Sequence, residues 1–216
     1  MKIYTGTSWS EKNQRRCAEL KIGMMSSPVD LVHPDKVIRE VDVACDNGAF
    51  RNFRDKTAFD EKKFYGWINS IERDVDFIPA PDIVMGRMKS AEYSAKHIGK
   101  IPFKTYFVVQ DGMTFEKVGH LISKCDGCFI GGSTKVGETK GWKWQMASHW
   151  IDHCHEIGLP VHMGRCPGTI VGMDSAEQMG IDSMDCSSLI RNGWLDRMDI
   201  FYKHKSEQVR LTTTCI

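Results

Sequence analysis

The chain has 216 residues, 41% of them hydrophobic and 26% charged, with a formal net charge of +1. This length buries one large core and is short for two, so we expect a single domain. The near-zero net charge excludes a global basic field, so a nucleic acid would have to be bound by a local patch. No apolar run reaches the roughly 18 residues that span a bilayer, and the first residues lack the apolar stretch of a signal peptide. We therefore expect a cytoplasmic protein without membrane contact.

Short β-prone runs recur along the chain, at Lys2–Thr5, Lys21–Met25, Val41–Cys45, Ile83–Gly86, Tyr106–Val109, Gly127–Ile130, Val161–Met163 and Ser183–Cys186. Helix-compatible stretches lie between them, at Glu11–Leu20, Glu61–Ile71, Ala91–His97, Phe115–Lys124, Trp142–Ile157 and Ile170–Met179. Several β-prone runs are continuously apolar, as strands buried on both faces are. The alternation predicts a parallel α/β fold. Eight such units in this length predict a single compact (β/α)8 barrel over residues 1–204, followed by a C-terminal tail over 205–216.

Polar residues follow several of the predicted strands at their C-terminal ends, where barrels of this kind carry their catalytic groups. Asp46 follows the third strand, Gln110 the fifth, Gly131–Ser133 the sixth and Gly164 the seventh, and Asp185 lies near the end of the eighth. Each is also an ordinary loop residue, so the signal is their joint placement. Two carboxylates that face each other across a barrel mouth suit chemistry at an anomeric carbon, where one attacks and the other moves protons. Asp46 is one candidate for such a pair, and the other is Asp182 or Asp185, of which only one can face the mouth because they point to opposite sides of their strand.

Two motifs carry a resemblance to the tRNA-guanine transglycosylase family. GIDSMDCSSLIR, at Gly180–Arg191, resembles the family's GVDMFDCVLPTR segment, and DNGAF, at Asp46–Phe50, resembles its DSGGF motif. The match covers roughly residues 41–191 and is strongest to the smaller DNA-acting relatives, the deazapurine-in-DNA enzymes of phages and bacterial modification islands. The resemblance implies that Asp185 is the nucleophile that forms a covalent sugar–enzyme intermediate, and that Asp46 is the general acid and base.

Shorter segments resemble the parts of that family that hold the base. Val109–Gln110 resembles its VQG segment, Gly131–Glu138 its GGLAVGE loop with one residue inserted, and His162–Gly164 its YLMG segment. The base-binding residues that the resemblance implies here are Asn47, Phe50, Met88, Gln110, Gly131, Gly132, Ser133, Met163 and Gly164.

The chain also departs from the family pattern. Asp82–Met85 resembles the family's DIVM segment, but Met88 stands where an aspartate reads the guanine edge. An apolar side chain cannot accept those hydrogen bonds, so another group reads the base or the base is not guanine. The tRNA-acting members of the family carry a C-terminal zinc site built from closely spaced cysteines and a histidine. This chain has Cys215 alone near its end. Because that appendage grips tRNA, its absence favours a DNA substrate.

The predicted function is therefore a DNA-guanine transglycosylase, a pentosyltransferase that exchanges guanine in DNA for a 7-deazaguanine such as its 7-cyano form. The expected partners are the free base and DNA in which the target guanine is flipped out or single-stranded. The sequence leaves open whether the protein forms a homodimer. No cofactor or metal is expected, because the leaving and entering bases are chemically alike. Candidate contacts to the nucleic acid are Arg165, Arg191 and Lys135, and further phosphate contacts could come from Arg15, Arg16, Lys89, Lys140 and Lys143, each of which is equally well a solvated charge.

Two other functions stay open for the same barrel. One is an N-glycosidase, in which water replaces the entering base, and the other is a non-catalytic nucleic-acid-binding subunit. A Cys2His2 zinc site can also be drawn from Cys125, Cys128, His149 and His153. Its spacing exceeds that of the usual zinc finger, so we favour reduced cysteines and surface histidines.

Overall fold

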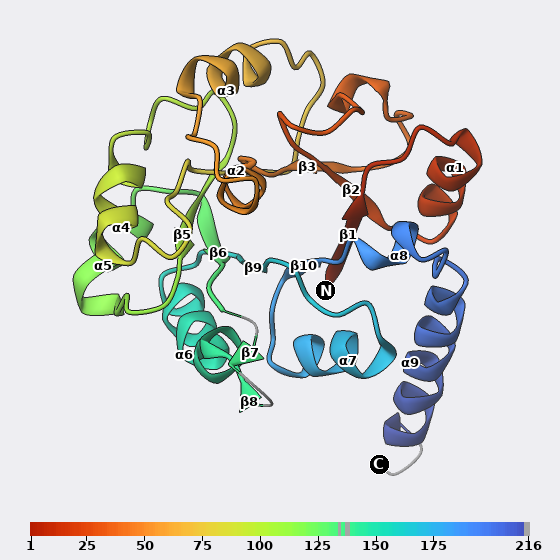
Figure 1. Ribbon diagram of the computed structural model, residues 1–216. Coiled ribbons are helices and arrows are strands. Elements are labelled where there is room, and N and C mark those ends of the chain that lie inside the picture. The colour runs from red at the N-terminus through yellow and green to blue at the C-terminus, as the bar shows by residue number, and fades with distance from the viewer. Residues whose placement is uncertain (134, 137–138, 214–216) are drawn as a thin grey trace.

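The computed structural model describes residues 1–133, 135–136 and 139–213, and it shows a (β/α)8 barrel (Figure 1). The barrel strands are β1 (Lys2–Gly6), β2 (Gly23–Ser26), β3 (Val43–Cys45), β4 (Ile78–Pro79), β5 (Thr105–Val109), β6 (Gly127–Ile130), β9 (Val161–Met163) and β10 (Ser183–Asp185), all parallel to their neighbours. The first strand, β1, pairs with both β2 and β10. The ring closes between β3 and the entry to β4, where Asp76 N donates to Val43 O at 2.7 Å and Cys45 N to Phe77 O at 2.9 Å. The predicted barrel is confirmed.

The helices surround the ring of strands, except for α2 (Ala49–Arg54), which lies over the opening of the ring in this view (Figure 1). They are α1 (Glu11–Glu19), α2 (Ala49–Arg54), α3 (Glu61–Ile68), α4 (Met88–Ala95), α5 (Phe115–Ile122), α6 (Trp142–Glu156), α7 (Ile170–Gln178), α8 (Ser188–Arg191) and α9 (Arg197–Thr213), with a 3-10 turn at Pro34–Lys36. A small antiparallel ribbon, β7 (Lys135–Val136) and β8 (Thr139–Lys140), precedes α6. Helix α9 continues without a break across the expected boundary between residues 204 and 205. None of the described helices has the length and apolar character needed to cross a bilayer.

The predicted fourth strand, Ile83–Gly86, is wrong. The chain turns there, with Met85 at φ 60° and Gly86 N donating to Ile83 O at 2.8 Å. The strand lies earlier, at Ile78–Pro79, and Pro79 with the nearby Pro81 interrupts the apolar pattern that would have revealed it. The apolar side chains of Ile83 and Met85 are instead 44% and 74% exposed at the barrel mouth.

Alternation along the strands separates side chains that point into the barrel from side chains that point outward. Side chains that point outward pack under the helices, while Tyr4, Met25, Ala44, Phe77, Tyr106, Val108 and Phe129 form a separate cluster inside the barrel. His162 lies among these inner rings, with centroids 4.9 Å from Phe77 and 4.8 Å from Phe129. The same alternation sends Asp185 inward toward the mouth, because its neighbour Met184 packs in the outer core.

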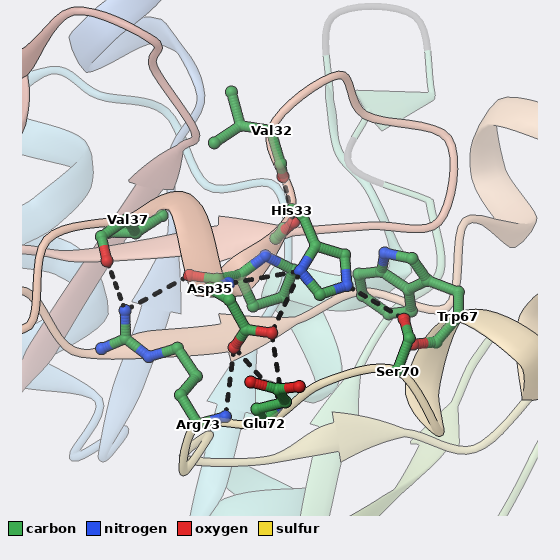
Figure 2. A network of polar contacts seen from close by, with 10 residues as sticks. Val32, His33, Asp35, Val37, Trp67, Ser70, Glu72 and Arg73 are labelled. Carbon is green, nitrogen blue, oxygen red and sulfur yellow. Dashed lines mark hydrogen bonds and ion pairs between the residues drawn. The ribbon is translucent and has the colours of Figure 1, made fainter.

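A polar network holds the segment that leads into β3 (Figure 2). The Asp35 carboxylate accepts the backbone N–H groups of Glu72 and Arg73, each at 3.1 Å. The buried guanidinium of Arg73 donates to Val37 O at 2.9 Å and to Val41 O at 2.7 Å. Buried donors and acceptors that satisfy one another in this way fix the β2–β3 loop against the α3–β4 loop. The strand that carries Asp46 at its end thus starts from a fixed position.

Candidate active site

A cavity of about 670 Å³ opens at the C-terminal ends of the strands. Its volume is in the range of small-molecule sites. Loops that follow β3, β4, β5, β6 and β9 supply its walls, as expected for this fold. Most of the predicted site residues line it: Asp46, Asn47, Phe50, Gln110, Gly131, Gly132, Ser133, Gly164 and Arg165. Other residues at the same wall, among them Asp82, Asp111 and Lys143, were not predicted as site residues for the base.

Asp185 ends β10 next to Gly164 and Arg165, which line this cavity, but it is not itself a lining residue; its carboxylate is held through one oxygen. Its Oδ1 accepts the backbone N–H of Arg165 at 2.9 Å and lies 3.1 Å from His162 Nε2. The other ring nitrogen of His162 lies 2.9 Å from Ser183 Oγ, and burial lowers the pKa of the imidazole. A neutral imidazole next to a carboxylate carries its proton on Nε2, so His162 donates to Asp185. Among the described residues Oδ2 has no hydrogen-bond partner, which leaves that oxygen available to attack.

Gly164 makes room for this arrangement. A Cβ at this position would lie 2.4 Å from the Phe129 ring and 3.4 Å from Asp185 Oδ1. Since real Cβ atoms do not approach a ring so closely, a larger residue would displace the floor of the site. The sequence could have indicated the role of His162, which contacts Asp185, because a polar side chain in the middle of a buried strand needs a hydrogen-bond partner.

Asp46 follows β3 and has an unusual proton affinity. Burial raises its pKa to about 7, with further increases from the nearby negative charges of Asp185 and Asp82, while the N–H of Gly48 acts in the opposite direction. That N–H donates to Asp46 Oδ1 at 2.5 Å, and Gly48 adopts φ 79°, a conformation that favours glycine. A carboxyl that is about half protonated near neutral pH can both donate and accept a proton.

Asp82, which the sequence analysis did not assign to the site, lies between two predicted site residues. Asn47 Nδ2 donates to Asp82 Oδ1 at 2.9 Å, and Gln110 Nε2 donates to Asp82 Oδ2 at 3.2 Å. Gln110 Nε2 also contacts Ser90 Oγ at 2.9 Å. Burial raises the pKa of Asp82 to about 6, and the hydrogen bond from Asn47 opposes the shift. The position could have been found had the strand been placed before Asp82 instead of after it.

Three expected contacts are not brought to the cavity. Met88 begins α4 and packs on the outer core, and Met163 is fully buried in that core because alternation in β9 turns His162 inward instead. Arg191 is exposed on α8 and does not line the cavity. The side chain of Lys135 lies outside the part of the structure that is described.

Lys143 contradicts its expected role as a surface phosphate contact, because it is only 1% exposed. It lies in the first turn of α6 and lines the cavity, and its Nζ donates to Gly164 O. Burial lowers the pKa of Lys143, while the negative charges of Asp185 and Asp111 act in the opposite direction. Sequence could not show this, since lysines are rarely buried without a paired charge.

Arg165 and Phe50 form part of the rim. The guanidinium carbon of Arg165 lies 3.6 Å from the centroid of the Phe50 ring, a cation–π contact at the cavity's opening. Phe50 remains 36% exposed and the neighbouring Phe53 is 49% exposed. An apolar rim with a cation offers a surface on which a nucleic-acid base can stack.

The drawn Cys2His2 set is not assembled. The thiol of Cys128 contacts that of Cys154, and His153 stacks on Phe115 with ring centroids 4.4 Å apart. Among the residues that the structure describes, no three His, Cys, Asp or Glu side chains lie together in a way that could hold a metal ion.

Comparison with known proteins supports the architecture. No family model matches the chain, and no curated protein matches it. A solved structure, that of phospho-2-dehydro-3-deoxyheptonate aldolase (DAHP synthase) from Thermotoga maritima, is similar over 94% of this chain and 68% of that chain, with a TM-score of 0.51 and 9% identity. At this identity the likeness shows the barrel fold alone, because barrels of this kind host many unrelated reactions.

Proposed function

We propose that the protein exchanges a guanine in DNA for a free 7-deazaguanine base. The observation that carries the proposal is the pairing of two differently prepared carboxylates at one mouth. Asp185 is held by His162 and Arg165 through Oδ1, with Oδ2 unengaged among the described residues, and Asp46 has a pKa near 7. One is suited to attack and the other to move protons.

The steps balance without a redox partner or an energy source. Asp185 Oδ2 attacks C1′ of the deoxyguanosine, the C1′–N9 bond breaks, and its electron pair leaves with the guanine, which takes the proton of Asp46. The entering base then gives its N9 proton to ionised Asp46, and its N9 attacks C1′. The bond between C1′ and Asp185 breaks, and the carboxylate is restored with the original configuration at the sugar.

Asp82 supplies what Met88 lacks for recognition of guanine. Each oxygen of Asp82 accepts one hydrogen bond from Asn47 or Gln110, which leaves acceptor capacity on both. Carboxylate oxygens at a cavity wall suit the N1–H and exocyclic amine of guanine, so Asp82 takes the reading role in this proposal. The exposed rim at Phe50 would stack the flipped base, whose extraction from a duplex costs a few kcal/mol.

Incubation of DNA with labelled 7-cyano-7-deazaguanine tests the proposal. We expect label in the DNA and an equal amount of released guanine, and loss of both with Asp185→Ala. Release of guanine without incorporation would instead show an N-glycosidase. Binding of DNA with neither product would show a non-catalytic subunit.

A further inference from the structure

Lys143 is a buried cation for which the described residues supply little compensation. Its Nζ carries three N–H groups, of which one donates to Gly164 O. Within the described ranges no second acceptor lies within hydrogen-bond distance, and no carboxylate lies within ion-pair distance. The side chain is 1% exposed, so bulk water does not compensate for the missing partners.

Another buried cation in the same chain shows the usual solution. Arg73 is 7% exposed, and its guanidinium donates to the backbone oxygens of Pro34, Val37 and Val41. Figure 2 shows the contact with Val37. Burying a charge is unfavourable unless hydrogen bonds or an opposite charge compensate. Arg73 makes three such hydrogen bonds inside the protein and leaves only its Nε without a partner among the described residues, whereas Lys143 makes one and lines a cavity.

We propose that Lys143 selects the charge of the base that enters the cavity: its ammonium donates to an acceptor atom on that base and disfavours a base that carries a positive charge. The inference rests on the proposed function, since it describes the entering base of that exchange. It follows from the placement of Lys143 on the cavity wall beside Gly164, which also adjoins Asp185. A ligand acceptor there would complete the hydrogen bonding of the ammonium.

Two 7-deazaguanines separate this role from simple packing. The 7-cyano base is neutral and ends in an acceptor nitrogen, while the 7-aminomethyl base has the same ring and carries an ammonium at neutral pH. Like charges placed close together in a desolvated site are unfavourable, so Lys143 favours the cyano base. The carboxylates at the same mouth act in the opposite sense, so removal of the lysine charge shifts the preference toward the aminomethyl base.

The test measures equilibrium dissociation constants of the two free bases for the wild-type chain, Lys143→Met and Lys143→Gln. Lys117→Gln is the matched control, because Lys117 is an exposed lysine on α5 that does not line the cavity. Lys143→Gln keeps a donor for Gly164 O but removes the charge, and it provides the result if Lys143→Met does not fold. We expect both Lys143 variants to shift the ratio of the two constants toward the aminomethyl base by about tenfold or more, and Lys117→Gln to leave it unchanged.

Thermal unfolding provides a second readout that a purely structural lysine would move the other way. We expect Lys143→Met to be at least as stable as the wild type, because an apolar side chain replaces an uncompensated charge. If the wild type binds the bases and the ratio is the same in both variants, the inference about Lys143 is wrong and the base exchange stands. If the wild type binds neither base, the proposed function and this inference are both wrong.

Discussion

The two ends of the barrel treat their charged groups differently. At the N-terminal end, Lys2 Nζ lies 2.8 Å from carboxylate oxygens of both Asp42 and Asp76, and the buried Tyr4 hydroxyl donates to Asp76 at 2.7 Å. Asp182 at the same end accepts the N–H of Val161 at 2.7 Å. This end is also hollowed, by about 500 Å³, but the charged groups of Lys2, Asp76 and Asp182 have partners within the chain.

At the C-terminal end, charges are held under conditions that disfavour them. Burial raises the pKa of Asp46 to about 7 and that of Asp82 to about 6, and it lowers the pKa of Lys143. Perturbed groups that share a cavity are typical of functional sites, where a ligand supplies the missing partners. The comparison indicates that charges at the N-terminal end stabilise the fold; under the proposed function, the C-terminal end gives up stability for reactivity. Substitutions at each end test that division.

The largest expected effect is on the rate of exchange in Asp46→Asn. The amide keeps an acceptor for the Gly48 N–H but cannot transfer a proton, so we expect the rate to fall by about 10²- to 10⁴-fold. In the wild type the rate should be greatest near pH 7, because protonation of the leaving base needs the acid form and activation of the entering base needs the ionised form. Label incorporation by the two proteins at pH values from roughly 5 to 9 measures the fall in rate and the pH optimum. A rate in Asp46→Asn within a few-fold of the wild type would remove Asp46 from the mechanism.

A smaller effect is expected at the N-terminal end, and it concerns stability alone. Asp76→Ala leaves the Tyr4 hydroxyl, which is buried, without its acceptor and breaks the contact with Lys2. We expect the free energy of unfolding to fall by about 1–3 kcal/mol. Denaturant titration measures this loss, while the exchange rate of the folded variant should match the wild type. If folded Asp76→Ala lost most of its exchange activity, the proposed division between a stabilising N-terminal end and a reactive C-terminal end would be contradicted.

The last expected effect is a gain in stability from Asp46→Asn. The pKa of Asp46 is about 7 in the folded state, above the usual 3.8. The folded state therefore binds this proton more tightly than the unfolded state, and protonation of Asp46 stabilises the fold. That contribution is full below about pH 4 and is lost as the pH rises through about 7. At pH 8, roughly, Asp46→Asn should therefore exceed the wild type in unfolding free energy by about 1–4 kcal/mol, where the upper figure is the full linkage of a shift from 3.8 to about 7, and the difference should shrink toward pH 4. An equal difference at both pH values would show that burial of the charge is not its cause.

Much of this architecture was readable from the sequence, because apolar runs mark buried strands and strand ends in a barrel converge on one mouth. Asp46 and Gln110 were placed at the cavity on that basis. The fourth strand was missed because Pro79 and Pro81 interrupt its apolar pattern. Asp82 was missed for the same reason, since it follows that strand. Lys143 could not be foreseen, since only the packing of α6 against the mouth decides whether that side chain meets solvent.

The account depends most on a covalent bond between Asp185 and the deoxyribose. Mass spectrometry measures that bond directly. The protein is incubated with a guanine-containing oligonucleotide, and the reaction is quenched before it is complete. We predict an adduct that maps to the peptide containing Asp185 and disappears when 7-cyano-7-deazaguanine is added, as modified DNA is released. Exchange that proceeds with Asp185→Ala, or an adduct on another residue, would contradict the account.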